Sequence, residues 1–116
     1  DSGVRAFGVH PGGIMTPLQR HLEQEEMVAL GWMDKDGQPT ERVAKMFKSA
    51  TQGASTTLWA ATSPQLDGIG GVYCENCEVA APTDDGENAR FIGVNDWAVD
   101  SDEASRLWDE TEHMLS

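Results

Sequence analysis

The feature that most constrains the fold is a turn, Pro11-Gly12-Gly13, placed directly after a short apolar stretch. Residues 3–9 alternate enough, and are few enough, to form one buried strand. Pro11 cannot donate to a sheet ladder, and glycine adopts backbone angles that other residues avoid, so the chain must leave the sheet here. In open α/β sheets, ligands bind outside such carboxyl ends of the strands.

Helical periodicity follows the turn. A helix is predicted from Pro17 to about residue 30, with Thr16 as its N-cap and proline at its first position. Apolar residues then recur at three- and four-residue steps from Thr40 to Ser63. This spacing predicts one amphipathic helix, or two helices with a break near Ser49.

The remainder is predicted to hold a last strand over residues 69–74, an irregular surface segment over 82–99 and a terminal helix over 101–114. Asp100 is placed to cap the terminal helix, and Glu103 to complete a capping box. The apolar residues of that helix, which would provide its docking side, are Leu107, Trp108 and Met114.

The composition is poor in core-forming residues. Leu, Ile, Val and Phe total 21 of 116 residues, and the formal net charge is −12. A chain of this kind approaches the range in which too little apolar surface is buried for independent order. We therefore expect the chain to be ordered only against a missing half of the same domain, or in an oligomer that exchanges elements.

The charge balance excludes several partners. Short acidic clusters are spread along the chain and favour a solvated surface, while 8 basic residues against 20 acidic ones offer no footprint for nucleic acid or anionic lipid. The sequence contains no apolar run near the roughly 20 residues that span a bilayer, so no membrane span is expected. Cysteine usage makes a cytoplasmic, reduced state the default expectation.

Cys74 and Cys77 form a Cys-x-x-Cys pair, for which three interpretations exist. A redox pair would place the first cysteine at a helix N-terminus, but residues 72–74 are predicted to be a strand. A structural zinc site needs four ligands, and His10, His21 and His113 show no ligand spacing to the cysteines. Packing or an incidental pair is favoured, and no metal site is predicted. His10 is expected to be a hydrogen-bonded structural histidine and His21 to be solvent exposed.

Four blocks of the sequence, in order, resemble the short-chain dehydrogenase/reductase family. They are residues 3–16, which resemble its sixth strand and following turn, and residues 52–61, 70–77 and 104–109. The sequences of these blocks are most similar to the branch of the family that includes the retinol dehydrogenases and the WW-domain oxidoreductase. The family's glycine-rich phosphate loop and its Tyr-x-x-x-Lys pair have no counterpart here, since the only tyrosine is Tyr73 and no lysine follows it by four residues.

The resemblance implies an α/β fold, the C-terminal part of a Rossmann-like doubly wound parallel sheet, with the last two strands and flanking helices, incomplete on its own. Residues 1–116 would then be part of a single domain: a strand and Pro-Gly turn over 1–16, a substrate lid over 17–48, a helix and last strand over 49–78, and a C-terminal tail and helix over 79–116. The family commonly forms homo-oligomers, and the same is expected here.

The resemblance also implies a nicotinamide cofactor, NAD or NADP, and interconversion of an alcohol and a carbonyl. The catalytic tyrosine and lysine would lie upstream, so no catalytic residue is expected in this chain, which alone should be inactive. Pro11 and Gly12 would shape the floor under the nicotinamide with Gly13, the Ile14 backbone would bond its carboxamide, and the Thr16 hydroxyl would contact the carboxamide or the diphosphate. Thr16 also has a plain N-cap role, which one hydroxyl can combine with the other.

The substrate lid of the family would be lined here by an apolar, methionine-rich set that suits a lipophilic alcohol or ketone, although ordinary helix packing explains it equally well. The set is Met15, Leu18, Leu22, Met27 and Trp32. The alternative function is a noncatalytic interaction module with a dehydrogenase-like fold. The choice between NAD and NADP stays open, because the residue that reads the ribose follows a strand absent from this sequence.

Overall fold

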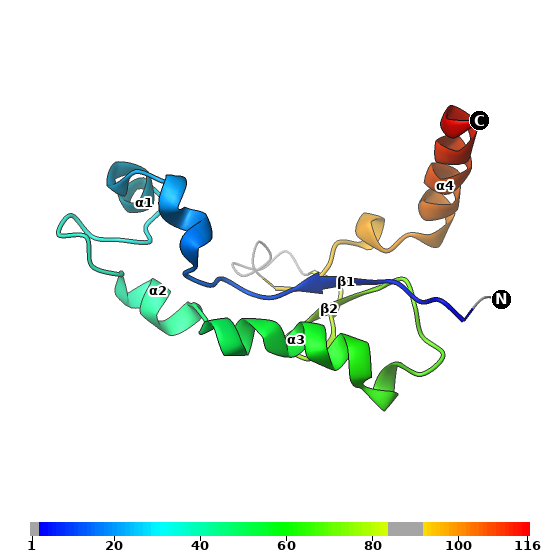
Figure 1. Cartoon of the computed structure of the whole chain (residues 1–116), viewed down its shortest axis with the longest axis horizontal. Helices are drawn as coiled ribbons and strands as arrows, with labels where there is room; N and C mark the ends of the chain where they lie inside the picture. The colour runs from blue at the N-terminus through cyan, green and yellow to red at the C-terminus, as the bar shows by residue number, and fades with distance from the viewer. Residues whose placement is uncertain (1–2, 84–91) are drawn as a thin grey trace.

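A small mixed sheet with one long helix beside it forms the centre of the molecule (Figure 1). The computed structural model describes residues 3–83 and 92–116. In chain order the elements are β1 (Phe7–His10), the 3-10 helix η1 (Pro17–His21), α1 (Gln24–Ala29), α2 (Glu41–Met46), α3 (Ala50–Thr62), η2 (Pro64–Leu66), β2 (Val72–Glu75), β3 (Glu78–Val79), η3 (Asp96–Ala98) and α4 (Ser101–Leu115).

Parallel pairing of β1 with β2 confirms the predicted α/β class. The register sets Phe7 opposite Val72 and His10 opposite Glu75, so both strands end at the same edge. A parallel pair needs a crossover connection, and α3 supplies it. Its buried residues Gly53, Thr56 and Ala60 recur at three- and four-residue steps, and the helix contacts both strands along this face.

The strands differ in extent from the prediction. The first begins at Phe7 rather than residue 3, and the second covers Val72–Glu75 rather than 69–74. Gly71 has a φ of +72°, which is incompatible with extended strand geometry, so residues 69–71 stay outside the second strand. The antiparallel strand β3 was not predicted. It pairs with β2 around a two-residue loop, Asn76-Cys77, in which both residues have positive φ.

The prediction of one continuous helix over 17–30 is wrong. Leu22 and Glu23 are both extended, with ψ of 130° and 154°, and they separate η1 from α1. The Glu23 N–H donates to the Glu26 carboxylate at 2.9 Å, so a new helix start interrupts the segment. Further along, the two-helix alternative is confirmed. Ser49 caps α3 and forms a capping box with Gln52, which ends the connection from α2.

The terminal helix α4 begins as predicted at its Asp100 cap, whose carboxylate accepts from the N–H groups of Asp102 and Glu103 at 2.9 and 3.0 Å. The predicted capping box is wrong, because the Glu103 carboxylate instead pairs with Arg106 at 2.6 Å. Figure 1 shows α4 projecting away from the sheet. Its predicted docking side is 66–74% exposed at Leu107, Trp108 and Met114.

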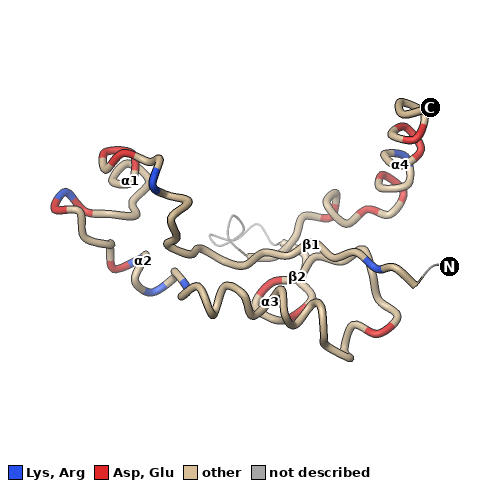
Figure 2. The backbone as a smooth tube through the Cα atoms, viewed as in Figure 1, with Lys and Arg blue, Asp and Glu red and all other residues tan. Residues whose placement is uncertain are grey.

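The molecule is open, as its composition indicates. The radius of gyration is 17.8 Å, against about 13 Å for a compact domain of this length. Within the described residues, the buried apolar side chains are Val43, Ala60, Leu66, Cys74 and Ala80. Acidic residues are spread along the chain rather than gathered at one place (Figure 2).

The predicted irregular segment includes residues 84–91, which lie outside the described residues. The described part of this segment contains the short helix η3 and a bridge between Pro82 and Val94.

The hairpin loop gives a first testable prediction. Cys77 has a φ of +60°, and Asn-Gly is the preferred pair for a two-residue loop of this kind. Replacing Cys77 with glycine should therefore raise the free energy of unfolding by about 1 kcal/mol, measured by urea denaturation. The Cys77 N–H, which donates to Thr56 Oγ1 at 3.2 Å, is retained in the variant. A clear loss of stability would instead show that the thiol itself is needed.

Candidate functional site

The carboxyl ends of β1 and β2 lie side by side, and the candidate site is built from the loops that follow them. After β1 comes the turn Pro11–Gly13, in which Gly12 has a φ of +92°. After β2 comes the hairpin loop Asn76-Cys77. The residue that follows the turn, Ile14, forms a parallel bridge with Lys48 in the connection between α2 and α3. Three segments far apart in the sequence thus meet at this edge.

Gly12 is favoured by its positive φ, and both glycines of the turn lie in close contact with side chains. A Cβ atom on Gly12 would lie 2.9 Å from Cδ of Lys48, and one on Gly13 would lie 2.9 Å from the Phe47 ring. Real Cβ atoms do not approach other atoms this closely. The turn therefore packs directly under the side chains of the α2–α3 connection.

Ile14 is held from three directions. The Gly13 carbonyl accepts from the Lys48 N–H at 2.8 Å, and the Ile14 carbonyl accepts from Nε2 of Gln19 at 3.0 Å. The Ile14 side chain packs against Gly53 on α3, where an added Cβ would lie 2.0 Å from Ile14 Cδ1. Among residues 3–83 and 92–116, the Ile14 N–H has no hydrogen-bond acceptor. This N–H is therefore a fixed donor.

Thr16 occupies the predicted N-cap position, now of the 3-10 helix η1. Its hydroxyl accepts from the Leu18 N–H at 3.2 Å and donates to Oε1 of Gln19 at 3.1 Å. The capping role is thus confirmed.

A pocket of about 390 Å³ opens at this edge of the sheet. Its apolar wall contains Trp32, Val43, Met46, Phe47 and Ile92, and its remaining lining residues are His10, Gly12, Gly13, Gly31, Arg42, Lys48, Glu75 and Asn76. The apolar wall and the scattered polar groups together are typical of a small-molecule site.

Two polar pairs are formed among the residues that line the pocket. Nζ of Lys48 donates to the Asn76 side-chain oxygen at 2.7 Å, which ties the α2–α3 connection to the hairpin loop. Nδ1 of His10 lies 3.8 Å from Glu75, whose other carboxylate oxygen accepts from the Gly93 N–H at 2.7 Å. The Glu75 side chain is only 7% exposed. At 3.8 Å this pair is too long for a hydrogen bond, so His10 has an acidic neighbour and its expected role as a hydrogen-bonded structural histidine stays a prediction.

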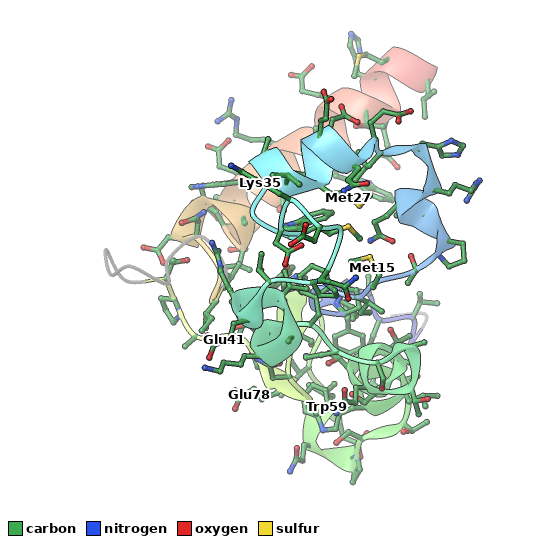
Figure 3. All side chains as sticks on the ribbon, turned by 90° about the vertical axis from the view of Figure 1, so that its left-hand side faces the viewer. Met15, Met27, Lys35, Glu41, Trp59 and Glu78 are labelled. Atoms are coloured by element: carbon green, nitrogen blue, oxygen red, sulfur yellow. The ribbon has the colours of Figure 1, made fainter. Side chains whose placement is uncertain are left out.

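Of the five residues predicted to line a substrate site, only Trp32 reaches this pocket. Its ring meets the Phe47 ring edge-on, with centroids 5.7 Å apart. Met27 lies on α1 and Met15 lies below it, near the middle of Figure 3, and neither lines the pocket. Leu18 is 76% exposed, and Leu22 is partly buried. The structure thus gathers Gly12, Gly13 and Trp32 at the pocket and leaves the other lid residues outside it.

The sequence interpretation did not find Phe47, Lys48, Glu75 and Asn76 as site residues. Their place at the pocket depends on parallel pairing between strands far apart in the chain, which no local pattern encodes. The break before Ser49 was the one available signal, because it marks where a connection must pass near the sheet.

The Cys-x-x-Cys pair lies in the hairpin, with both thiols free. Cys74 is fully buried in β2, and desolvation by burial raises the pKa of its thiol. In the part of the chain that the structure describes, no group of three or more His, Cys, Asp or Glu side chains is arranged to hold a metal ion.

Burial predicts unequal reactivity of the two thiols, since the thiolate is the nucleophile. At neutral pH, Cys77 should react rapidly with a thiol reagent and Cys74 only after unfolding, as counted by mass spectrometry. Burial in the native state disfavours the Cys74 thiolate. The buried, protonated Cys74 thiol therefore contributes fully to stability below the ordinary pKa of a thiol, and this contribution falls as the pH rises above it. A Cys77→Ser variant should lose the rapid reaction. Rapid modification of both thiols in the native protein would contradict this arrangement.

None of the described helices has the length and apolar character needed to cross a membrane.

Comparison with known proteins identifies relatives over nearly the whole chain. The chain is 37% identical over 98% of its length to the short-chain dehydrogenase/reductase prx1 of Penicillium roqueforti, of which it covers 31%. It is 38% identical over 98% of its length to a probable oxidoreductase of Streptomyces lividans, of which it covers 37%. It is 31% identical over 87% of its length to the chloroplastic short-chain dehydrogenase TIC 32 B of Brassica napus, of which it covers 25%. No family model and no solved structure matches it.

The chain therefore spans about a third of the length of the first two relatives, which agrees with the expected partial dehydrogenase domain. The parallel β1–β2 pair and the α3 crossover are consistent with the C-terminal part of such a domain, whereas the antiparallel strand β3 was not expected. On this sequence evidence and this architecture, the chain belongs to the short-chain dehydrogenase/reductase family.

Proposed function

We propose that this chain supplies part of the nicotinamide site and of the substrate pocket of an NAD- or NADP-dependent oxidoreductase that interconverts an alcohol and a carbonyl. The catalytic tyrosine and lysine of the family would lie upstream, and this chain alone would be inactive. The names of the relatives support an oxidoreductase in general terms.

The observation that carries the proposal is the Ile14 peptide. Its N–H is a fixed donor beside a glycine turn, at the edge where parallel strands end. A carboxamide oxygen is a suitable acceptor for such a donor. The residues present therefore fit a nicotinamide group.

In this proposal Pro11 and Gly12 shape the floor with Gly13, the Ile14 backbone holds the carboxamide, and the Thr16 hydroxyl contacts the carboxamide or the diphosphate. When bound, a nicotinamide supplies the ability to give or take a hydride at carbon. The residues of this chain would position that group and help to exclude water from it.

The pocket beside the turn is the proposed place for the substrate. Trp32, Met46 and Phe47 give it an apolar wall that suits a lipophilic alcohol or ketone. Met15, Leu18, Leu22 and Met27 remain proposed lid residues, which would contact substrate only through rearrangement of the segment from η1 to α1.

The test is a titration of the complete gene product with NADH and NADPH, followed by nicotinamide fluorescence. Thr16→Val should weaken binding about tenfold, the effect of one lost hydrogen bond to a polar ligand. Thr40→Val is the matched control, because Thr40 caps α2 in the same way but lies outside the turn. It should leave binding unchanged.

Two results would contradict the proposal: no binding of either dinucleotide by the unaltered protein, or equal losses in the two threonine variants. The first would favour the alternative of a noncatalytic interaction module. The retinol dehydrogenase and WW-domain branch, the homo-oligomer and the cytoplasmic location remain predictions from the sequence.

A further inference from the structure

We propose that Gln19 is a positioning residue for the nicotinamide site, because its side-chain amide sets the orientation of the Ile14 peptide. The inference rests on the proposed function and adds a residue that the sequence interpretation did not single out. Gln19 is partly buried on η1, directly after the turn.

The Gln19 amide uses both of its ends on the backbone around the turn. Its oxygen accepts from the Thr16 N–H at 2.7 Å and from the Thr16 hydroxyl at 3.1 Å, while its nitrogen donates to the Ile14 carbonyl at 3.0 Å. A donor faces the oxygen and an acceptor faces the nitrogen, so the partners define the orientation of the amide. An ordinary capping box needs only the oxygen, and the bond to Ile14 is additional.

This additional bond completes the restraint of Ile14. Lys48 already holds the carbonyl of the preceding peptide, that of Gly13, at 2.8 Å. The structure has no cis peptide bonds among its described residues, so the Ile14 N–H points opposite to the Gly13 carbonyl, away from Lys48. With the next carbonyl held by Gln19, neither peptide flanking the Ile14 Cα can rotate without losing a hydrogen bond. The direction of the free N–H is thereby fixed.

The chemistry of this position requires an amide. A glutamate would still accept from the Thr16 N–H, but it would place a carboxylate against the Ile14 carbonyl and donate nothing to it. Gln19→Glu therefore removes the positioning bond and keeps the helix cap, whereas Gln19→Leu removes both. Gln52→Glu is the matched control, since Gln52 forms the corresponding capping box on α3, with Ser49 N–H donating to its oxygen at 2.9 Å.

The experiment measures the affinity of the complete gene product for NAD(P)H and for ADP-ribose or its 2′-phosphate, which lack the nicotinamide. Gln19→Glu and Gln19→Leu should each bind NAD(P)H about tenfold more weakly. Both should bind the ADP-ribose compound as the unaltered protein does. Gln52→Glu should change neither affinity. Without any ligand, hydrogen exchange of the peptide covering residues 11–16 should be faster in both Gln19 variants and unchanged in Gln52→Glu.

The possible failures are distinguishable. Unchanged NAD(P)H affinity in Gln19→Glu, or an equal loss for the ADP-ribose compound, would overturn the role of Gln19 and leave the proposed function standing. Failure of the unaltered protein to bind NAD(P)H would overturn both. If the Gln19→Leu variant does not fold, Gln19→Glu still tests the role of Gln19, because it keeps the helix cap.

Discussion

Replacing Gly53 with alanine is expected to lower the free energy of unfolding by about 2 kcal/mol, although alanine is the better helix former by about 1 kcal/mol. The new Cβ would lie 2.0 Å from Cδ1 of Ile14 and 3.0 Å from its Cγ1. The Ile14 side chain would have to shift, and NAD(P)H affinity should fall as well if its peptide moves with it. Urea denaturation and the fluorescence titration measure the two effects.

A double-mutant cycle tests whether contact with Ile14 causes the destabilisation by Gly53→Ala. Ile14→Val lacks the Cδ1 atom that an alanine at position 53 would strike at 2.0 Å and keeps the Cγ1 atom at 3.0 Å, so in that background Gly53→Ala should cost much less. Gly70→Ala serves as the glycine control, because its Cβ would lie 3.7 Å from the nearest atom, in ordinary contact. Additive effects of Gly53→Ala and Ile14→Val would show that the two residues do not meet in the native protein.

Leu66→Ala should have the largest effect on stability, about 3 kcal/mol. Leu66 is 1% exposed and is among the few fully buried side chains of the described residues. Its backbone carbonyl also accepts a hydrogen bond from the Arg5 side chain. A cavity here would destabilise the connection between α3 and β2. The loss of stability would be measured as a lower urea midpoint.

Leu58→Ala is the matched control for Leu66→Ala. Leu58 lies on α3 and is 63% exposed, so the same atoms are removed with little loss of buried area. Its effect should stay within about 0.5 kcal/mol. Equal effects of the two substitutions would mean that Leu58 is covered in the complete protein.

Local signals predicted the starts of two helices well. Thr16 and Asp100 are polar residues placed before helical segments, and the structure uses both as N-caps. Ser49, predicted only as the place of a break, is the N-cap of α3. Such interactions span two or three residues, so the sequence alone contains them. The break at Leu22 was missed because helical periodicity of the flanking apolar residues continues across it.

The site was predicted only where it is local. The glycine turn and Thr16 follow one another in the chain, whereas Lys48 and Asn76 arrive from later segments and meet above Gly12 only through tertiary structure. The loop Asn76-Cys77 lacks the usual glycine of a two-residue hairpin, and β3 was missed for that reason. The relatives identify the family, whereas the geometry at the carboxyl ends of β1 and β2 is seen only in the structure.

The parallel pairing of β1 with β2 also has a consequence for the order of folding. Phe7 and Val72 are partners about 65 residues apart in the sequence. Closing so long a loop has an entropic cost, and contacts between neighbouring residues do not incur it. The β2–β3 hairpin and the capped helices involve neighbouring residues and are expected to form first. The pocket edge exists only once β1 has joined them. During synthesis, the edge that carries the candidate site would therefore be completed only after the ribosome has released residue 75, long after the Pro-Gly-Gly turn has emerged.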